Sequence, residues 1–270
     1  GIAVETSVGF GNMISTHCNF GSQMTAYKSQ VYRDLARLMS DAGLTPNLQF
    51  GEFLWWFFTN YSTFNPGGGM AFYDPETRAD AMTALGRELH LFRTPDDNPD
   101  VNGGADALFL RNRLRDHVNS LRAAVLAEHP NAKFELLWPY DVNHPTPAGV
   151  HQLGGRLNRF VNLPAEWEQK EGSGLDRIKM EALDFSMWSR DSNLIHKSIE
   201  FPLDLGWPKD SVRYLVAIFR GAYTWEREFW YARNLGIPVV NMWAFDHVCI
   251  FGLPVPEREY RPRTAQQGRR

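Results

Sequence analysis

The segment Leu48–Phe58, with the sequence LQFGEFLWWFF, places one carboxylate in a run that is otherwise mostly apolar. Its first residues have the pattern of a β-strand, and Glu52 precedes the paired indoles of Trp55 and Trp56. A lone glutamate is costly to bury unless it is paired, hydrogen-bonded or protonated, and protonation suits a general acid. The segment therefore predicts an acid at a strand end beside indole faces for a sugar ring. The alternative is that Glu52 lies in water while the two indoles fill the core.

The segment belongs to a longer alternation of strand-like and helical patterns. Helical spacing covers residues 24–42, 105–128, 192–199 and 224–234, and another helix begins near Asp74-Pro75-Glu76. Strand patterns cover residues 4–10, 48–52, 134–140, 178–185, 212–219 and 239–245, with 89–92 as a seventh candidate. Such alternation predicts an α/β fold around a parallel sheet.

A closed (β/α)₈ barrel needs eight strands, and the chain supplies six or seven. We therefore expect a TIM-barrel-like fold that lacks its first one or two strands, which would lie upstream of Gly1. An open, doubly wound sheet is the alternative. The pattern predicts a single domain over residues 1–255 and a disordered basic tail over 256–270. Because the chain begins without Met, we expect it to be part of a longer, multidomain parent protein.

Composition excludes several classes of function. The formal net charge of -3 and pI near 6.3 give no electrostatic footprint for nucleic acid. A mean hydropathy of -0.38, with no run of about 18 apolar residues, gives no sign of a membrane partner. Two cysteines define no disulfide framework, the histidines are too scattered for metal-ligand spacing, and no cofactor motif is present.

The predicted strand ends share one character, in that carboxylates stand beside aromatic residues. Active sites of parallel α/β folds gather at these ends. Each single case also fits a helix cap or a core indole, but four together favour a carbohydrate cleft. The predicted catalytic residues are Glu52, Glu181 and Asp141. The predicted substrate-binding residues are Trp55, Trp56, Trp138, Tyr140, Trp243, Asp246 and His247.

Glycoside hydrolysis requires an acid and an ionised carboxylate. Glu52 is the best acid/base candidate, Glu181 and Asp141 are the leading partners, and Asp246 stands behind them. Alternation along residues 178–185 puts Glu181 and Asp184 on opposite faces of one strand, so only one of them can point into a barrel.

Part of the chain resembles clan A glycoside hydrolases of the β-galactosidase type. The resemblance rests on His17-Cys18-Asn19, the helix through Tyr32 and Leu38, and the strand that ends in Gly51-Glu52. It implies that Glu52 is the acid/base. The chain departs from the family at Gly51, where the family has Asn. A second departure is the segment 212–219, the expected seventh strand, which lacks the family's nucleophilic Glu.

A longer run resembles glycoside-hydrolase-like barrels of phage-tail-like proteins. The matching stretches are Gln49-Phe50-Gly51-Glu52, residues 137–141 and residues 241–246. The resemblance implies an extracellular location or a phage-tail-like particle. Together these observations predict a glycoside hydrolase acting on a poly- or oligosaccharide, with Glu52 as general acid/base. The alternative is a non-catalytic carbohydrate-binding or structural module.

Overall fold

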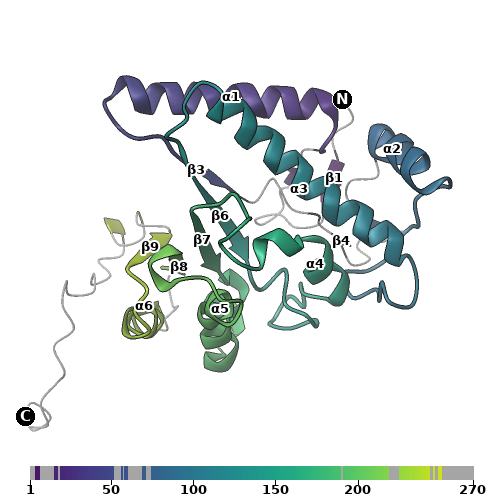
Figure 1. Ribbon diagram of the computed structural model, residues 1–270. Coiled ribbons are helices and arrows are strands. Elements are labelled where there is room, and N and C mark those ends of the chain that lie inside the picture. Colours follow the sequence, from purple (N-terminus) through teal and green to yellow (C-terminus); the bar gives the residue numbers. More distant parts are fainter. Residues whose placement is uncertain are drawn as a thin grey trace, which may run out of the picture.

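The computed structural model is built around one sheet of five parallel strands (Figure 1). The strand order β3-β6-β7-β8-β9 follows the order of the chain. Right-handed crossovers between successive parallel strands place their helices on the same face of a sheet. The sheet accordingly curls into a half-barrel with helices on its outer side.

The structure describes residues 4–6, 15–17, 19–51, 56, 58–59, 69–70, 74–189, 191–218, 225–243, 246 and 249–250. The sheet strands are β3 (Asn47–Phe50), β6 (Lys133–Pro139), β7 (Arg177–Glu181), β8 (Val212–Ala217) and β9 (Val239–Trp243). The α-helices are α1 (Ser22–Asp41), α2 (Pro75–Leu85), α3 (Gly104–Leu126), α4 (Arg156–Val161), α5 (Ser192–Asp204) and α6 (Trp225–Asn234). The shorter elements are β1 (Val4–Thr6), β2 (Ser15–His17), β4 (Phe58–Thr59), β5 (Gly69–Met70), η2 (Ala165–Trp167), η3 (Phe185–Ser189) and η4 (Lys209–Ser211).

Local sequence explains where helices begin and end. Asp74 is the N-cap of α2, and its carboxylate accepts hydrogen bonds from the amides of Glu76 and Thr77 at 3.1 and 3.0 Å. Gly43, directly after the C-cap of α1, has a φ of 76°, a left-handed conformation that glycine adopts without strain. The helices predicted at residues 24–42 and near 74 are therefore confirmed.

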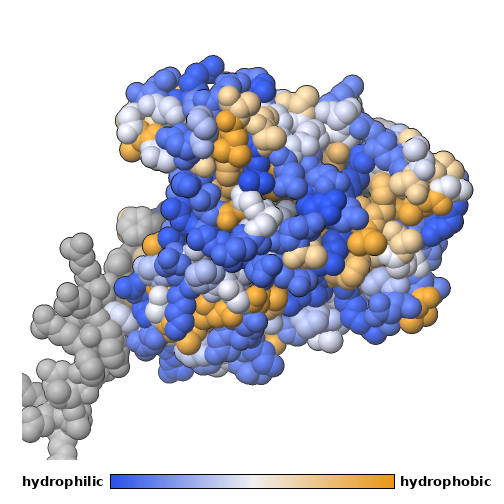
Figure 2. Space-filling model, in the orientation of Figure 1, coloured by the Kyte–Doolittle hydropathy of each residue, from blue (hydrophilic) through white to orange (hydrophobic). Residues whose placement is uncertain are grey.

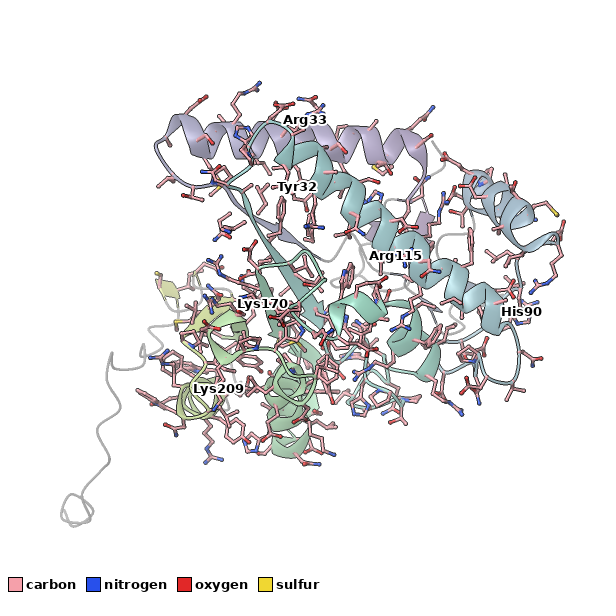
Figure 3. The ribbon with its side chains drawn as sticks, in the orientation of Figure 1. Tyr32, Arg33, His90, Arg115, Lys170 and Lys209 are labelled. Atoms are coloured by element: carbon pink, nitrogen blue, oxygen red, sulfur yellow. The ribbon has the colours of Figure 1, made fainter. Side chains whose placement is uncertain are left out.

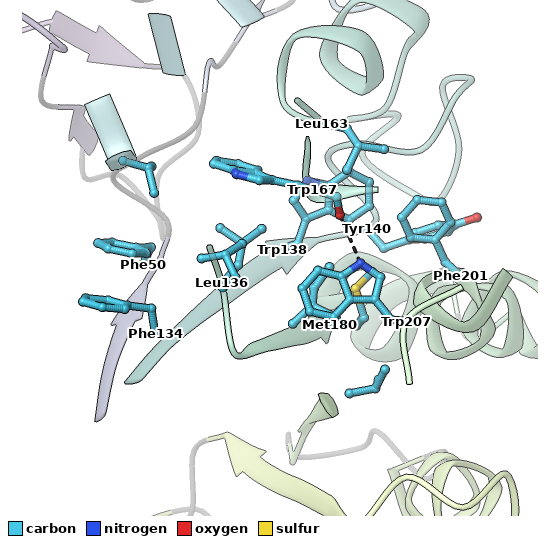
Figure 4. Close-up of a cluster of buried hydrophobic side chains, with 14 of the residues drawn as sticks. Phe50, Phe134, Leu136, Trp138, Tyr140, Leu163, Trp167, Met180, Phe201 and Trp207 are labelled. Carbon is cyan, nitrogen blue, oxygen red and sulfur yellow. Dashed lines mark hydrogen bonds between the residues drawn. The ribbon is translucent and has the colours of Figure 1, made fainter. Parts of the chain in front are cut away.

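The core lies between the sheet and its helices (Figure 4). On one face of the sheet, Phe50, Phe134, Leu136, Trp138 and Met180 are fully or nearly fully buried. Strand β6 is buried along both faces after its first residue, as its continuous apolar run predicts. This core fixes which face of each strand is turned away from the helices.

The predicted (β/α)₈ barrel is wrong as an account of the described chain, whereas the α/β class and parallel sheet are confirmed. Within the described residues, β3 and β9 are the two edge strands and do not pair with each other. The N-terminal strand pattern at residues 4–10 gives β1, which pairs antiparallel with β2 outside the main sheet. Strands β4 and β5 form a second separate antiparallel pair.

The side chains on the other face of the sheet, away from the helices, are polar where a closed barrel would have apolar ones. Lys179 Nζ lies 2.6 Å from Glu135 Oε1 and donates to Gln49 Oε1 at 2.7 Å, so a polar ladder crosses β3, β6 and β7. Arg177 extends it by donating to Asn47 at 2.8 Å. Closed barrels fill the equivalent face with branched apolar layers. The charged residues on this face are therefore unlike those of a packed barrel interior.

Two further strand predictions need correction. Residues 89–92 form no strand. Strand β7 ends at Glu181, and the chain then turns into the π-helix η3, so Asp184 is not a strand residue. The predicted alternation of Glu181 and Asp184 on opposite faces of one strand therefore does not apply.

Helix α1 turns an unexpected face to the core. Its buried residues are Lys28, Ser29, Tyr32 and Ala36. Figure 3 shows Tyr32 below the helix, on the side of the sheet, and its hydroxyl donates to the Gln49 carbonyl at 2.9 Å. Tyr27 and Leu38, which share the apolar spacing of this helix, are 66% and 63% exposed.

The surface is mainly hydrophilic in the view of Figure 2, with apolar side chains gathered over α2 and the start of α3. Met82 and Leu108 are exposed there. None of the helices that the structure describes is long and apolar enough to cross a bilayer.

Candidate functional site

Strands β6 and β7 bring two predicted catalytic carboxylates to one edge of the sheet. Pro139 is the register partner of Glu181, and the Tyr140 amide donates to the Glu181 carbonyl at 2.8 Å. Asp141 follows immediately and is 4% exposed, while Glu181 is 3% exposed. The carboxyl ends of adjacent parallel strands thus hold two buried acidic side chains, in the position where α/β folds bind ligands.

Asp141 connects the ends of the two strands. Its Oδ2 accepts the Asp184 amide at 2.7 Å, and its Oδ1 accepts the Val142 amide at 2.9 Å. Burial raises the pKa of Asp141 to about 6, and the Asp184 carboxylate adds to the increase, although the backbone hydrogen bonds oppose it. Asp141 therefore holds the turn after β7 in place and changes charge in the mildly acidic range.

Asp184 contacts a histidine from a distant loop. The loop after β6 brings His151 over the turn after β7, where His151 Nδ1 lies within hydrogen-bond distance of Asp184 Oδ1. The His151 amide also lies 3.3 Å from Asp184 Oδ2. Asp184 is buried, but the His151 side chain is 51% exposed. A buried carboxylate thus orients an imidazole that reaches solvent.

Gly149 permits this contact. It has a φ of 74°, and a β-carbon built on it would collide with Asp184 Oδ2 and come within 3.0 Å of Asp184 Cγ. Only glycine provides both the backbone conformation and the space at this position. Trp188 from η3 completes the cluster, with its ring edge-to-face with His151 at 5.7 Å and half of its surface exposed.

Three predicted sugar-binding aromatics have a different position from the one expected. Trp56 and Trp138 are fully buried, and their indole N–H groups donate to the carbonyls of Leu110 and Asn162, both at 2.8 Å. Tyr140 is 6% exposed and packs against Phe201, as Figure 4 shows. Large apolar rings gain more from burial in this core than from exposure, so these faces are not presented to a ligand.

The remaining predicted residues are only partly covered by the structure. Trp243 ends β9 and is partly buried, and Asp246 is exposed. Glu52, Trp55 and His247 lie outside the described residues. In sequence, Glu52 follows β3 by two residues, and β3 is the direct neighbour of β6.

Sequence reasoning missed His151 and misassigned Asp184. Loop contacts between residues 33 positions apart leave no periodic pattern. The available signals were Gly149, two positions before His151, and the carboxylate-to-indole spacing from Asp184 to Trp188.

A metal centre and a cavity are the other kinds of site that the described residues could offer besides this edge of the sheet. Across the described residues, His, Cys, Asp and Glu side chains nowhere gather in threes that could hold a metal ion. A cavity of about 620 Å³ lies elsewhere, between residues 90–102 and Arg156, and none of the predicted site residues lines it.

A scan against protein-family models finds no match to this chain, and a search of the curated proteins finds none either.

Proposed function

We propose that this protein is a glycoside hydrolase whose reaction takes place at the carboxyl ends of β3, β6 and β7. The observation that carries the proposal is the pair of buried carboxylates, Asp141 and Glu181, on adjacent strand ends. Burial of acidic side chains costs free energy, and such groups concentrate where chemistry requires them. The paired strand ends support a substrate site there.

Each carboxylate has a separate role in the proposal. Glycoside hydrolysis passes through an oxocarbenium-like transition state, which needs a proton on the leaving oxygen and negative charge near the ring. Glu52 is the general acid/base, since it follows the strand next to β6. Glu181 supplies the negative charge, and Asp141 holds the turn that follows Glu181.

The sugar platform in this proposal uses fewer indoles than the sequence suggested. Among the described aromatics, Trp188 is half exposed at the same strand end, and Trp243 is partly exposed at the end of β9. Indole faces stack on the apolar face of a pyranose, and hydroxyl groups at the ring edge take polar partners. The substrate class is therefore a poly- or oligosaccharide.

A second candidate is a carbohydrate-binding or structural module without catalysis. It is favoured by the end of β8, where neither Ala217 nor the following residue, Ile218, carries a carboxylate. Under this alternative, saccharides bind and are not cleaved.

Release of reducing ends from a panel of polysaccharides tests the proposal. Glu52→Gln and Glu181→Gln should each lower kcat by about 10²–10⁴-fold, the range expected for an essential acid or charged group. Glu166→Gln is the matched control, because Glu166 is exposed and pairs with Arg115 away from these strand ends. Full activity in Glu52→Gln would remove its assignment, and binding without cleavage by the wild type would favour the second candidate.

A further inference from the structure

The contact between His151 and Asp184 has the construction of an acid–base pair. Asp184 is buried at the turn after β7, and both of its carboxylate oxygens face His151, one toward the ring and one toward the backbone amide. The loop is held in this position by a glycine that allows the backbone to approach the carboxylate. Two separate contacts therefore fix both the position and the orientation of the imidazole.

The arrangement determines which ring nitrogen is available. The carboxylate of Asp184 accepts from Nδ1, so Nδ1 carries the hydrogen and Nε2 presents a lone pair. Nδ1 is engaged with Asp184, and half of the side chain reaches solvent beside Trp188. An imidazole oriented by a carboxylate, with its other nitrogen free for a reacting group, is a recurrent general base.

The carboxylate behind His151 is itself held by the backbone. The Asp184 amide donates to Asp141 Oδ2, so the residue that orients the histidine is tied to the end of β6. Glu181 lies three positions before Asp184, at the end of β7. The pair thus belongs to the same strand ends as the proposed catalytic carboxylates.

We propose that His151, oriented by Asp184, is the general base that activates water for glycoside hydrolysis in this protein. The inference rests on the proposed function and divides its proton transfers between two residues, with Glu52 as the acid and His151 as the base. Nε2 accepts one proton from water as the water oxygen bonds to the anomeric carbon. The glycosidic C–O bond breaks, and its electron pair goes to the leaving oxygen, which receives the proton of Glu52. The proton on His151 then returns to Glu52 through solvent, so one water is consumed in each cycle.

This assignment has a stereochemical consequence. Water that attacks opposite the leaving group inverts the anomeric configuration, whereas a carboxylate nucleophile gives retention through a covalent intermediate. Trp188 lies edge-to-face with His151 and is half exposed, so the proposal places the sugar ring beside both residues. The product of a cleaved oligosaccharide should therefore have the inverted configuration.

The test combines kinetics with product analysis on an oligosaccharide that the wild type cleaves. His151→Ala should lower kcat by about 10²–10⁴-fold with little change in KM, and added imidazole should restore part of the rate. Asp184→Asn should lower kcat by about 10²-fold or more, because the orienting charge is lost. His129→Gln is the control, since His129 pairs with Ser40 far from these strand ends and should leave kcat unchanged. Nuclear magnetic resonance of the first product should show the inverted anomer.

The outcomes separate this inference from the proposed function. If Glu52→Gln abolishes activity while His151→Ala retains it, or if the product keeps its configuration, His151 is not the base and the hydrolase assignment stands. If the wild type cleaves no saccharide, both assignments fail. If circular dichroism shows that His151→Ala is misfolded, the rate of Asp184→Asn and the configuration of the product decide whether His151 is the base.

Discussion

The carboxylate of Asp184 lies directly against the α-carbon of Gly149, with no room for a β-carbon between them. The two residues are 35 positions apart and join the loop after β6 to the turn after β7. Because this approach places His151 on Asp184, the conformation of one glycine determines the geometry of the candidate acid–base pair.

Gly149→Ala should therefore destabilise the protein and displace His151 from Asp184. The substitution adds a strained left-handed φ to a steric collision, and together these should lower the free energy of unfolding by about 2–4 kcal/mol. Gly43→Ala is the matched control. Gly43 has a φ of 76°, and a β-carbon there meets nothing within 4 Å, so only the strain of about 1 kcal/mol remains. Urea unfolding measures both variants, and equal losses would contradict a close contact at Gly149.

Two tyrosines of α1 should respond differently to truncation. Tyr32 is buried and bonded to the Gln49 carbonyl, so Tyr32→Ala should lower the free energy of unfolding by about 3–5 kcal/mol. Tyr27 lies five residues earlier and is 66% exposed, so Tyr27→Ala should change the free energy of unfolding by about 0.5 kcal/mol or less. Chemical denaturation of the two variants side by side checks the orientation of the helix. Equal effects would mean that α1 faces the core differently.

The same helix shows what sequence periodicity can and cannot provide. Apolar spacing predicted a helix over residues 24–42, and that helix exists. The spacing did not reveal which face is buried, because Lys28 and Ser29 are buried while Leu38 is exposed. Buried polar groups find partners on α3: Lys28 Nζ lies 3.4 Å from His117 Nε2. Such pairings depend on a distant segment and cannot be derived from spacing alone.

The positions of the sheet strands were predicted better than whether the sheet closes into a barrel. The continuous apolar run of β6, the alternation along β7 and the strand pattern over residues 212–219 located these sheet strands within a few residues. The number of strands and the parallel order do not decide whether a sheet closes, because closure depends on how its two edges meet. The ion pair of Glu135 and Lys179 on the open face of the sheet was not predicted from the strand patterns, because its two residues lie on different strands.

For the candidate site, too, local patterns were informative and contacts between distant segments were not. Because the carboxyl ends of parallel strands meet at one edge, the sequence predicted that Asp141 and Glu181 lie together, and the structure places both at the ends of β6 and β7. Their catalytic role stays a prediction. Trp56 and Trp138 were predicted to bind substrate, but both are buried core residues. His151 could not be found in this way, because a long loop brings it to Asp184 and no local pattern records the contact.

His117 should make the protein less stable in mild acid. Burial lowers the pKa of His117 to about 3, and the charges of Lys28 and Arg113 contribute. In the unfolded chain histidine takes up a proton below about 6.5, whereas the folded state resists protonation down to about 3. Stability should therefore fall as pH decreases from about 6.5 to about 3, by about 5 kcal/mol from this residue.

His117→Gln tests that expectation through urea unfolding at several pH values. The variant lacks the titrating ring, so its free energy of unfolding should fall less steeply below pH 6.5 than that of the wild type. Measurements at pH 7–8, where both side chains are neutral, give the constant cost of losing the contacts to Thr25 and Lys28. Parallel curves for the two proteins below pH 6.5 would show that His117 protonates freely in the folded state.

Asp141 should change stability with pH in the opposite direction to His117, over an overlapping range of pH. Its pKa is raised to about 6, chiefly by burial, while the unfolded value is near 3.9, so the folded state binds the proton more tightly. The contribution of Asp141 to stability should therefore fall as pH rises from about 4 to about 6, by about 3 kcal/mol. Asp141→Asn removes the titration and preserves the side-chain shape. The difference in free energy of unfolding, wild type minus variant, should decrease by that amount between pH 4 and pH 7. A constant difference would mean that Asp141 has the same pKa in the folded and unfolded chains, because the hydrogen bonds from the amides of Val142 and Asp184 then offset the cost of burial.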